Sequence, residues 1–245
     1  MSTIALVTGA NRGLGLAAAT ALARTGATVI VAGRDEAATR DSAQSLVDQG
    51  LRAEALTLDV TSTASVAAGA AEIERRHGRL DVLVNNAGIL PEATASGARE
   101  FVDVPSLIAT FETNVFGVAS VTEQFLPLLR RSEGARIVNV SSTMGSLSDQ
   151  SDPESPFYAS VVPAYQASKA AVNSLTIGLS KKLGDGPMKV TSVCPGWVQT
   201  DLAPGNREQA PTSAEDAAQV IVKAATLPED APSGTFMDID GPVRW

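Results

Sequence analysis

Short apolar runs alternate with helical patterns along this chain of 245 residues. Runs of this kind are typical of strands buried on both faces of a sheet. Strands are predicted at Ile4–Val7, Thr28–Ala32, Ala53–Leu58, Val82–Val84, Arg136–Val140, Lys189–Val193 and Gly234–Ile239. Helices are predicted at residues 14–25, 36–49, 63–77, 100–131, 163–183 and 213–225. The alternation predicts an α/β fold in which helices cover both faces of a parallel sheet.

A glycine-rich turn follows the first predicted strand. Residues 8–15 read Thr-Gly-Ala-Asn-Arg-Gly-Leu-Gly, and an alanine-rich helical stretch comes next. A dinucleotide pyrophosphate can sit in such a place, because glycine lets the backbone approach and the helix N-terminus offers free N–H groups. The spacing Gly-x-x-x-Gly-x-Gly differs from the better-known Gly-x-Gly-x-x-Gly. A purely structural turn is the alternative interpretation.

Tyr165 and Lys169 lie four residues apart in the predicted helix 163–183, so their side chains share one face. A phenol ordinarily titrates near pH 10, and a neighbouring cation favours its ionised form. We therefore expect Lys169 to lower the pKa of Tyr165, which would let the phenol exchange a proton near neutral pH. Taken alone the pair is a weak motif that chance could produce.

These motifs occur in order with three others along most of the chain. They are Thr8-Gly-x-x-x-Gly-x-Gly15, Asn85-Asn86-Ala87-Gly88, Ser142, Tyr165-x-x-x-Lys169 and Pro195-Gly196. The chain resembles the compact branch of the short-chain dehydrogenase/reductase family, and within it the NADPH-dependent carbonyl reductases. The resemblance implies one Rossmann-like domain over residues 1–245, a doubly wound seven-stranded parallel sheet in the order 3-2-1-4-5-6-7. Ligands bind such sheets at the carboxyl ends of the strands.

The resemblance also implies catalytic roles. Tyr165 would be the general acid in carbonyl reduction, and Lys169 would lower its pKa and bind the nicotinamide ribose. Ser142 would hydrogen-bond the substrate oxygen. Asn114 would anchor a water that relays protons to Lys169. Ser141 is excluded because neighbours in a strand point to opposite faces, and the family places the catalytic hydroxyl on the second serine of Asn-x-Ser-Ser.

The implied cofactor is NADP(H) in preference to NAD(H). Gly33 leaves space at the end of the second predicted strand, and Arg34 offers a fork suited to a 2′-phosphate, with Arg12 as a second cation. Asp35 would reverse the preference if it faced the ribose. The implied cofactor contacts are Gly9, Asn11, Arg12, Gly13, Leu14, Gly15, Arg34, Asp59, Val60, Asn86, Ala87, Gly88, Tyr165, Lys169, Pro195, Gly196, Val198 and Thr200.

The substrate would touch Ser142, Tyr165 and Trp197, the last being a candidate for the pocket wall. Residues 145–163 read as a loop or short helical insertion, since Tyr165 follows Ser142 at a longer distance than in most of the family. This segment could cover the pocket or alter subunit contacts. We expect a homo-oligomer, a dimer or a tetramer, with a monomer as the alternative. Trp245 is expected to pack rather than react.

Composition narrows the classes of partner. A net charge of −8 disfavours nucleic acid and anionic membranes, and no apolar stretch approaches the ~20 residues of a membrane span. One cysteine, Cys194, is expected to be a buried filler and indicates a reducing, cytoplasmic setting without a cleavable leader. His77 is expected to be solvated. With one histidine and one cysteine, no metal site and no Ser-His-Asp triad is predicted.

Other functions remain open at this point. An NAD-dependent alcohol dehydrogenase of the same family would need the same catalytic residues. A nucleotide-sugar epimerase or dehydratase shares the fold, but those enzymes are usually longer. A non-catalytic protein that senses the cofactor would be favoured by loss of Tyr165 or Lys169, and both are present.

Overall fold

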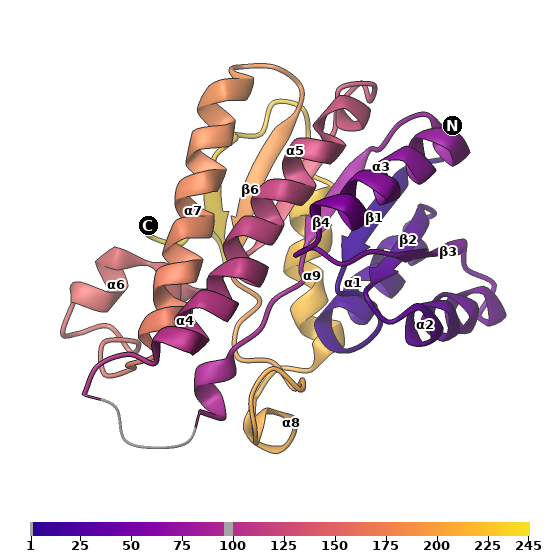
Figure 1. The fold of residues 1–245 in the computed structure, drawn as a ribbon. Coiled ribbons are helices and arrows are strands. Elements are labelled where there is room, and N and C mark those ends of the chain that lie inside the picture. Colours follow the sequence, from indigo (N-terminus) through magenta and orange to yellow (C-terminus); the bar gives the residue numbers. More distant parts are fainter. Residues whose placement is uncertain (1, 96–99) are drawn as a thin grey trace.

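The computed structural model of the protein describes residues 2–95 and 100–245. Its sheet is entirely parallel and has the order β3-β2-β1-β4-β5-β6-β7, as the family resemblance implied. Figure 1 shows the helices arranged around this sheet. The strands are β1 (Ile4–Thr8), β2 (Thr28–Gly33), β3 (Ala53–Thr57), β4 (Val82–Asn85), β5 (Arg136–Val140), β6 (Lys189–Val193) and β7 (Thr235–Met237). The strand order turns back between β1 and β4, which is where doubly wound sheets bind ligands.

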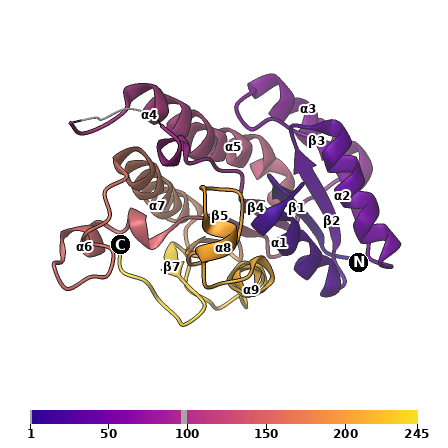
Figure 2. The same cartoon turned by 90° about the horizontal axis from the view of Figure 1, so that it is seen from below.

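Helices cover both faces of the sheet (Figure 2). They are α1 (Gly13–Arg24), α2 (Glu36–Asp48), α3 (Thr63–His77), α4 (Val104–Phe111), α5 (Gly117–Leu129), α6 (Leu147–Ser151), α7 (Pro163–Leu183), α8 (Asn206–Gln209) and α9 (Ala214–Ala225). Leu22 of α1 and Ile221 of α9 pack in the core on one face. Ile73 of α3 and Phe125 of α5 pack in the core on the other face. This arrangement is the predicted doubly wound architecture.

The helix predicted at 100–131 is interrupted. A π-helical turn, η2 (Glu112–Phe116), separates α4 from α5. Such turns insert one extra residue into the helical path and are frequent at functional sites. Apolar spacing continues through the turn, so this break in the helix could not be predicted from the residue pattern. The turn contains Asn114.

The helical run Val104–Leu129 is long and apolar enough to cross a membrane by length and composition. The sequence expectation that no such stretch exists was therefore wrong. Val121, Phe125 and Leu129 of this run are buried in the core with side chains from the sheet. The apolar character of the run is thus accounted for by its packing as a core helix.

The segment 145–163 forms the short helix α6, in agreement with the expected helical insertion. The last two residues of the chain bind this segment. The Arg244 guanidinium pairs with the carboxylates of Asp149 and Asp152, and the Trp245 carbonyl accepts a hydrogen bond from the Ser148 N–H. The Trp245 ring stacks on Phe236 with 5.5 Å between centroids, so the residue packs as expected.

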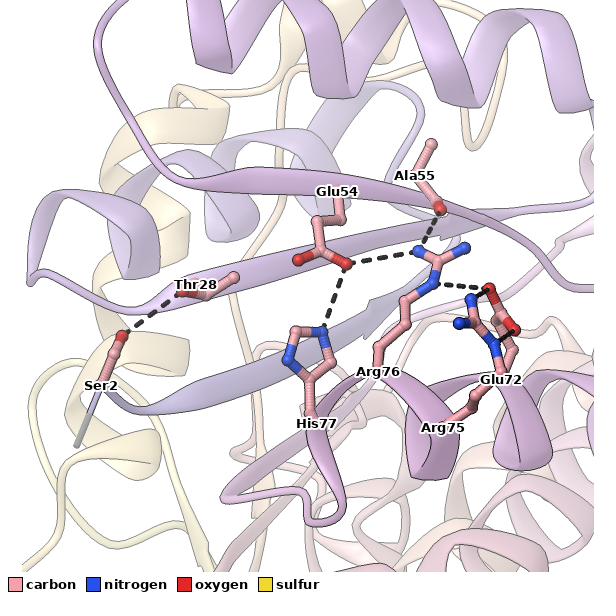
Figure 3. Close-up of polar contacts among 8 residues, drawn as sticks. All are labelled: Ser2, Thr28, Glu54, Ala55, Glu72, Arg75, Arg76 and His77. Atoms are coloured by element: carbon pink, nitrogen blue, oxygen red, sulfur yellow. Dashed lines mark hydrogen bonds and ion pairs between the residues drawn. The ribbon is translucent and has the colours of Figure 1, made fainter.

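His77 is not solvated as expected. Its side chain is only 14% exposed, and Nε2 lies 3.2 Å from the Glu54 carboxylate on the edge strand β3 (Figure 3). Arg76 also reaches Glu54, at 3.2 Å, and the carbonyl of Ala55, at 3.3 Å. The charged end of α3 therefore faces the outer strand of the sheet. This contact could not be read from the charge of the helix alone.

Candidate active site

Tyr165 and Lys169 lie in the first turns of α7, whose observed bounds match the predicted helix. Both side chains are buried, with 8% and 5% of their surface exposed. The Lys169 Nζ lies 5.4 Å from the centroid of the Tyr165 ring, so the two groups share a face. The same Nζ donates a 2.8 Å hydrogen bond to the carbonyl of Val140 at the end of β5. The helix thereby holds the pair against the carboxyl edge of the sheet.

The electrostatics of the pair differ from the sequence expectation. Burial raises the pKa of Tyr165 above its ordinary value, and the neighbouring Cys194 adds to the rise. Burial also lowers the pKa of Lys169 to about 8. Lys169 forms no ion pair within the residues that the structure describes. In the protein alone, desolvation therefore outweighs the expected effect of the cation on the phenol.

Ser141 and Ser142 point in different directions, as the alternation of a strand requires. Ser141 is buried, and its Oγ lies 2.7 Å from Oδ1 of Asn173. Ser142 is partly exposed and extended, and its Oγ accepts a hydrogen bond from the Met144 N–H at 3.2 Å. Only the second serine is thus accessible at the edge of the sheet.

The short helix η3 (Thr143–Gly145) packs directly on α7. A Cβ on Gly145 would lie 2.6 Å from the backbone and Cβ of Lys169, so only glycine fits this contact. This close approach places the residues after Ser142 beside the Lys169 turn of the helix. Gly145 carries no local signal of this role, since the contact depends on α7, which comes later in the chain.

Asn114 lies in the π turn and is buried. Its Oδ1 accepts a hydrogen bond from the Ile89 N–H at 2.9 Å, and its Nδ2 donates to the Ile89 carbonyl at 3.0 Å. Nδ2 also lies 3.2 Å from the Ser168 hydroxyl, one residue before Lys169. A Cβ on Gly88 would be 3.5 Å from Oδ1 of Asn114 and 3.8 Å from Nζ of Lys169. Asn114 therefore joins the segment after β4 to α7.

The glycine turn packs tightly on the end of β4. A Cβ on Gly15 would be 2.3 Å from the Gly9 carbonyl and 2.4 Å from Nδ2 of Asn86, while Gly9 has a φ of 62° and lies against Ala87. Nδ2 of Asn86 donates to the carbonyls of Thr8 and Gly9. Gly9 and Gly15 are therefore required by close contacts within the protein, which the structural alternative for this turn also predicted. The approach of the turn to a cofactor pyrophosphate stays a prediction.

The N-terminus of α1 has no side-chain cap from the residue that precedes it. The residue before it, Arg12, is extended and makes no side-chain cap, and the helix begins at Gly13, which has a φ of 53°. Uncapped N–H groups at the positive end of a helix are suited to an anion. Leu14 packs against the core behind the turn, which anchors it.

Charged residues surround the end of β2. Asp35 caps α2, its carboxylate accepting a hydrogen bond from the Ala38 N–H at 3.0 Å. Arg34 is exposed and has no hydrogen bond or ion pair within the described residues. Asn11 lies close to Gly33, since a Cβ on that glycine would be 3.5 Å from its side chain. The glycine turn and Arg34 thus border the same region, and the carboxylate that could oppose a phosphate is held in a cap.

The remaining predicted positions lie on loops at the same edge. The Asp59 carboxylate accepts hydrogen bonds from the N–H and hydroxyl of Thr61, and Val60 packs on Gly117. In the loop after β6, which begins at Pro195, Val198 pairs with Thr212. Gly196 has a φ of 82°, which favours glycine.

The loop after β6 approaches the glycine turn. A Cβ on Gly13 would lie 3.4 Å from Cγ2 of Thr200. Trp197 is half exposed, and its Nε1 donates a 3.0 Å hydrogen bond to Oδ1 of Asn206 at the start of α8. Cys194, just before this loop, is buried as expected, and its Sγ accepts a hydrogen bond from the Thr143 N–H. Figure 2 shows α8 at the end of the molecule that faces the viewer.

Glu92 is a site residue that the sequence analysis missed. It lies in the short helix η1 (Pro91–Ala93), and its carboxylate accepts hydrogen bonds from the N–H groups of Ala164 and Tyr165 at 3.1 and 2.9 Å. The contact joins positions more than seventy residues apart in the sequence. A lone glutamate in a loop carries no local signal of such a role.

The fold and the edge of the sheet define a Rossmann-like protein with a buried tyrosine–lysine pair, and the comparisons agree. Residues 3–211 match the family described as short chain dehydrogenase. The chain belongs to this family of oxidoreductases.

Among curated relatives, the chain is similar to the short-chain dehydrogenase anuI of Penicillium roqueforti, at 38% identity over 95% of this chain and 91% of the relative. It is also similar to the (+)-neomenthol dehydrogenase of Arabidopsis thaliana, at 33% identity over 95% and 94%. Among solved structures it resembles the NADPH-bound carbonyl reductase from chicken fatty liver, with a TM-score of 0.85 and 27% identity over 100% and 99% of the two chains.

Proposed function

We propose that the protein is an NADPH-dependent reductase that converts the carbonyl group of a small molecule, a ketone, aldehyde or quinone, into an alcohol. The observation that carries this proposal is the buried Tyr165–Lys169 pair at the carboxyl edge of the sheet. Such a pair suits a reaction in which the protein supplies a proton to a developing alkoxide. The names of relatives, which include dehydrogenases and reductases of small molecules, agree with this chemistry.

The residues present fit a dinucleotide cofactor. The uncapped start of α1, the glycine contacts with no room for a Cβ, and the exposed Arg12 and Arg34 form a backbone cradle with cations beside it. In an acidic protein, such local features are what an anionic cofactor requires. NADP(H), when bound, supplies the hydride. Arg34 would bind its 2′-phosphate, and the capping role of Asp35 supports this choice over NAD(H).

The chain's own residues would handle the proton. Tyr165 would donate its hydroxyl proton to the substrate oxygen, and Ser142 would hydrogen-bond that oxygen as negative charge develops. Lys169 would offset the charge left on the phenol and bind the nicotinamide ribose. Asn114, which holds Ile89 and contacts Ser168, would support the water that returns a proton through Lys169. Trp197, half exposed beside α8, would form a wall of the substrate pocket.

We also propose a homo-oligomer in the cytoplasm. Val104, Ile108, Phe116 and Leu175 expose apolar side chains on the α4–α5 run and on α7, the helices expected to form a subunit contact. Light scattering at micromolar concentration should give a multiple of the 25.2 kDa chain mass. The mass of a single chain would contradict this part of the proposal.

A spectrophotometric screen tests the proposed reaction. The purified protein is incubated with NADPH or NADH and a panel of cyclic terpenoid ketones, aliphatic aldehydes and quinones, and oxidation of the nicotinamide is followed. The expected result is carbonyl-dependent oxidation with a larger kcat/KM for NADPH than for NADH. Faster turnover with NADH would instead favour the NAD-dependent alcohol dehydrogenase. Tight NADPH binding without turnover on any carbonyl or alcohol would favour a cofactor sensor.

A further inference from the structure

The first turn of α7 lacks a cap of the ordinary kind. Its preceding residue, Val162, has no side chain that could accept a hydrogen bond, and Pro163 opens the helix without an N–H. The first donors without a partner in the helix itself are therefore the buried N–H groups of Ala164 and Tyr165. Donors at a helix start are normally satisfied by a Ser, Thr, Asp or Asn immediately before the helix.

Glu92 replaces that cap from a distant part of the chain. Its Oε1 accepts from Ala164 and its Oε2 from Tyr165, so both carboxylate oxygens are used. A negative charge at the positive end of a helix adds a favourable electrostatic contribution. One of the two N–H groups belongs to Tyr165 itself, so the carboxylate fixes the backbone that carries the phenol.

The segment that carries Glu92 is held at two other points. At its start, Asn86 donates to the carbonyls of Thr8 and Gly9 in the glycine turn. In its middle, Ile89 exchanges two hydrogen bonds with Asn114. Glu92, at its end, is the contact that extends this chain of hydrogen bonds to Tyr165.

We propose that Glu92 is a positioning residue that fixes Tyr165 relative to the cofactor-binding edge of the sheet. The inference rests on the proposed function, because it concerns the residue that would donate the proton. A general acid must lie within hydrogen-bond reach of the substrate oxygen, and a displacement of about 1 Å can reduce the rate by about a hundredfold. Loss of the cap frees the first turn of α7, on which the placement of the phenol depends.

The test uses Glu92→Ala and Glu92→Gln in the full-length protein, with Ser213→Ala as the matched control. Ser213 caps α9 by accepting from the Asp216 N–H, so its loss removes a helix cap that does not carry Tyr165. For each variant, NADPH binding sites are counted by fluorescence titration, and kcat is expressed per site. Hydrogen exchange of the peptide that starts α7 reports the cap directly.

Glu92→Ala should lower kcat per site by about tenfold with little change in the Kd of NADPH, and should increase the solvent isotope effect on kcat. Glu92→Gln keeps one acceptor oxygen and should lose only about two- to threefold. Exchange should accelerate at the start of α7 in the alanine variant. Ser213→Ala should lower stability and leave kcat per site unchanged.

Two outcomes would overturn the positioning role while the wild-type protein is active. One is a kcat per site within twofold of wild type for Glu92→Ala. The other is an equal loss in Ser213→Ala, which would make the effect one of general stability. A wild-type protein that binds NADPH and turns over no carbonyl would instead count against the proposed function itself.

Discussion

Two regions of the molecule differ in how their charged side chains are paired and buried. At the outer edge of the sheet, Glu54, Glu72, Arg75, Arg76 and His77 form a network in which each charged group has an opposite or complementary partner (Figure 3). At the carboxyl edge, Lys169 is buried, and the Val140 carbonyl is the one hydrogen-bond acceptor that the described part of the chain gives its ammonium group. The charged groups at the outer edge are therefore paired with one another near solvent. The Lys169 ammonium group is instead buried away from solvent.

The shifts in pKa record this difference. Hydrogen bonds from Arg75 and Arg76 lower the pKa of Glu72 to about 2, so the interaction favours the charged form. Burial lowers the pKa of Lys169 to about 8, so the protein disfavours its charged form. Exposed ion pairs contribute little to stability, whereas an unpaired buried cation costs free energy. A group kept at such a cost is a candidate for function, because perturbed pKa values cluster at functional sites.

The largest loss of activity is expected for a substitution of Tyr165, the proposed proton donor beside Lys169. Tyr165→Phe removes only the hydroxyl and should lower kcat by about 10²–10⁴-fold, the usual contribution of a general acid. The Kd of NADPH should stay close to that of wild type. Steady-state turnover and fluorescence titration measure the two quantities. Retention of more than about half of the activity would show that Tyr165 is not the proton donor.

Arg34 represents a third situation, an exposed cation without a partner among the described residues. Arg34→Asp should weaken NADPH binding by at least ~1.5 kcal/mol, the scale of a lost charge-assisted hydrogen bond, and bring NADH level with NADPH or ahead. Arg24→Asp, at the far end of α1, makes the same charge change as a control. Equal cofactor preference in Arg34→Asp and wild type would remove Arg34 from the phosphate site.

The smallest effect is expected in the paired network. Glu54→Gln removes the carboxylate shared by Arg76 and His77 and should lower the unfolding free energy by no more than about 1 kcal/mol, with unchanged turnover. Thermal denaturation with an activity assay measures both. A loss of several kcal/mol would show that the network carries far more of the stability than exposed pairs do.

The network should also respond to acid. The folded-state pKa of Glu72 is depressed from 4.5 to about 2, so its contribution is fully present above pH 4.5 and is lost as the pH falls toward 2. The difference in stability between wild type and Glu72→Gln should therefore shrink over that range. A difference that stays constant to pH 2 would contradict the role of its charge.

Much of the fold could be predicted, because strands such as β1 and β2 are buried along nearly their whole length and read as short apolar runs. The bounds of α7 were predicted correctly, since Pro163 and the following helix formers mark its start. The break at Glu112–Phe116 was not predictable, because its residues keep the apolar spacing of a regular helix. Strand geometry predicted that only one of Ser141 and Ser142 reaches the edge of the sheet, and the family resemblance assigned the catalytic role to the second. In the structure Ser141 is buried against Asn173 and Ser142 is partly exposed, so the assignment of Ser142 stays a prediction.

The features that could not be predicted from the sequence depend on contacts between distant parts of the chain. The spacing of Tyr165 and Lys169 predicted their shared face but not their burial, and burial reversed the expected shift in the pKa of the phenol. His77 was expected in solvent because its helix is charged, yet the partner strand lies beside that helix end. Glu92 reaches α7 across the fold, so no local pattern could reveal it.

We infer that Lys169, which has no ion-pair partner among the described residues, is kept buried for function, and Lys169→Met tests this inference most directly. The pKa of Lys169 falls from 10.5 to about 8, which corresponds to a cost of up to about 3 kcal/mol at neutral pH, reduced by the lost hydrogen bond to Val140.

Between pH 8 and 10.5 the unfolded state binds more protons at this residue than the folded state, so wild-type stability should rise relative to the variant. Unfolding of the cofactor-free proteins at pH 7 and pH 10, with turnover measured at pH 7, is the decisive experiment. The variant should be the more stable protein at pH 7, by about 1–3 kcal/mol, with a smaller advantage at pH 10 and almost no activity. A variant that is less stable than wild type at pH 7, or that keeps its turnover, would contradict the account.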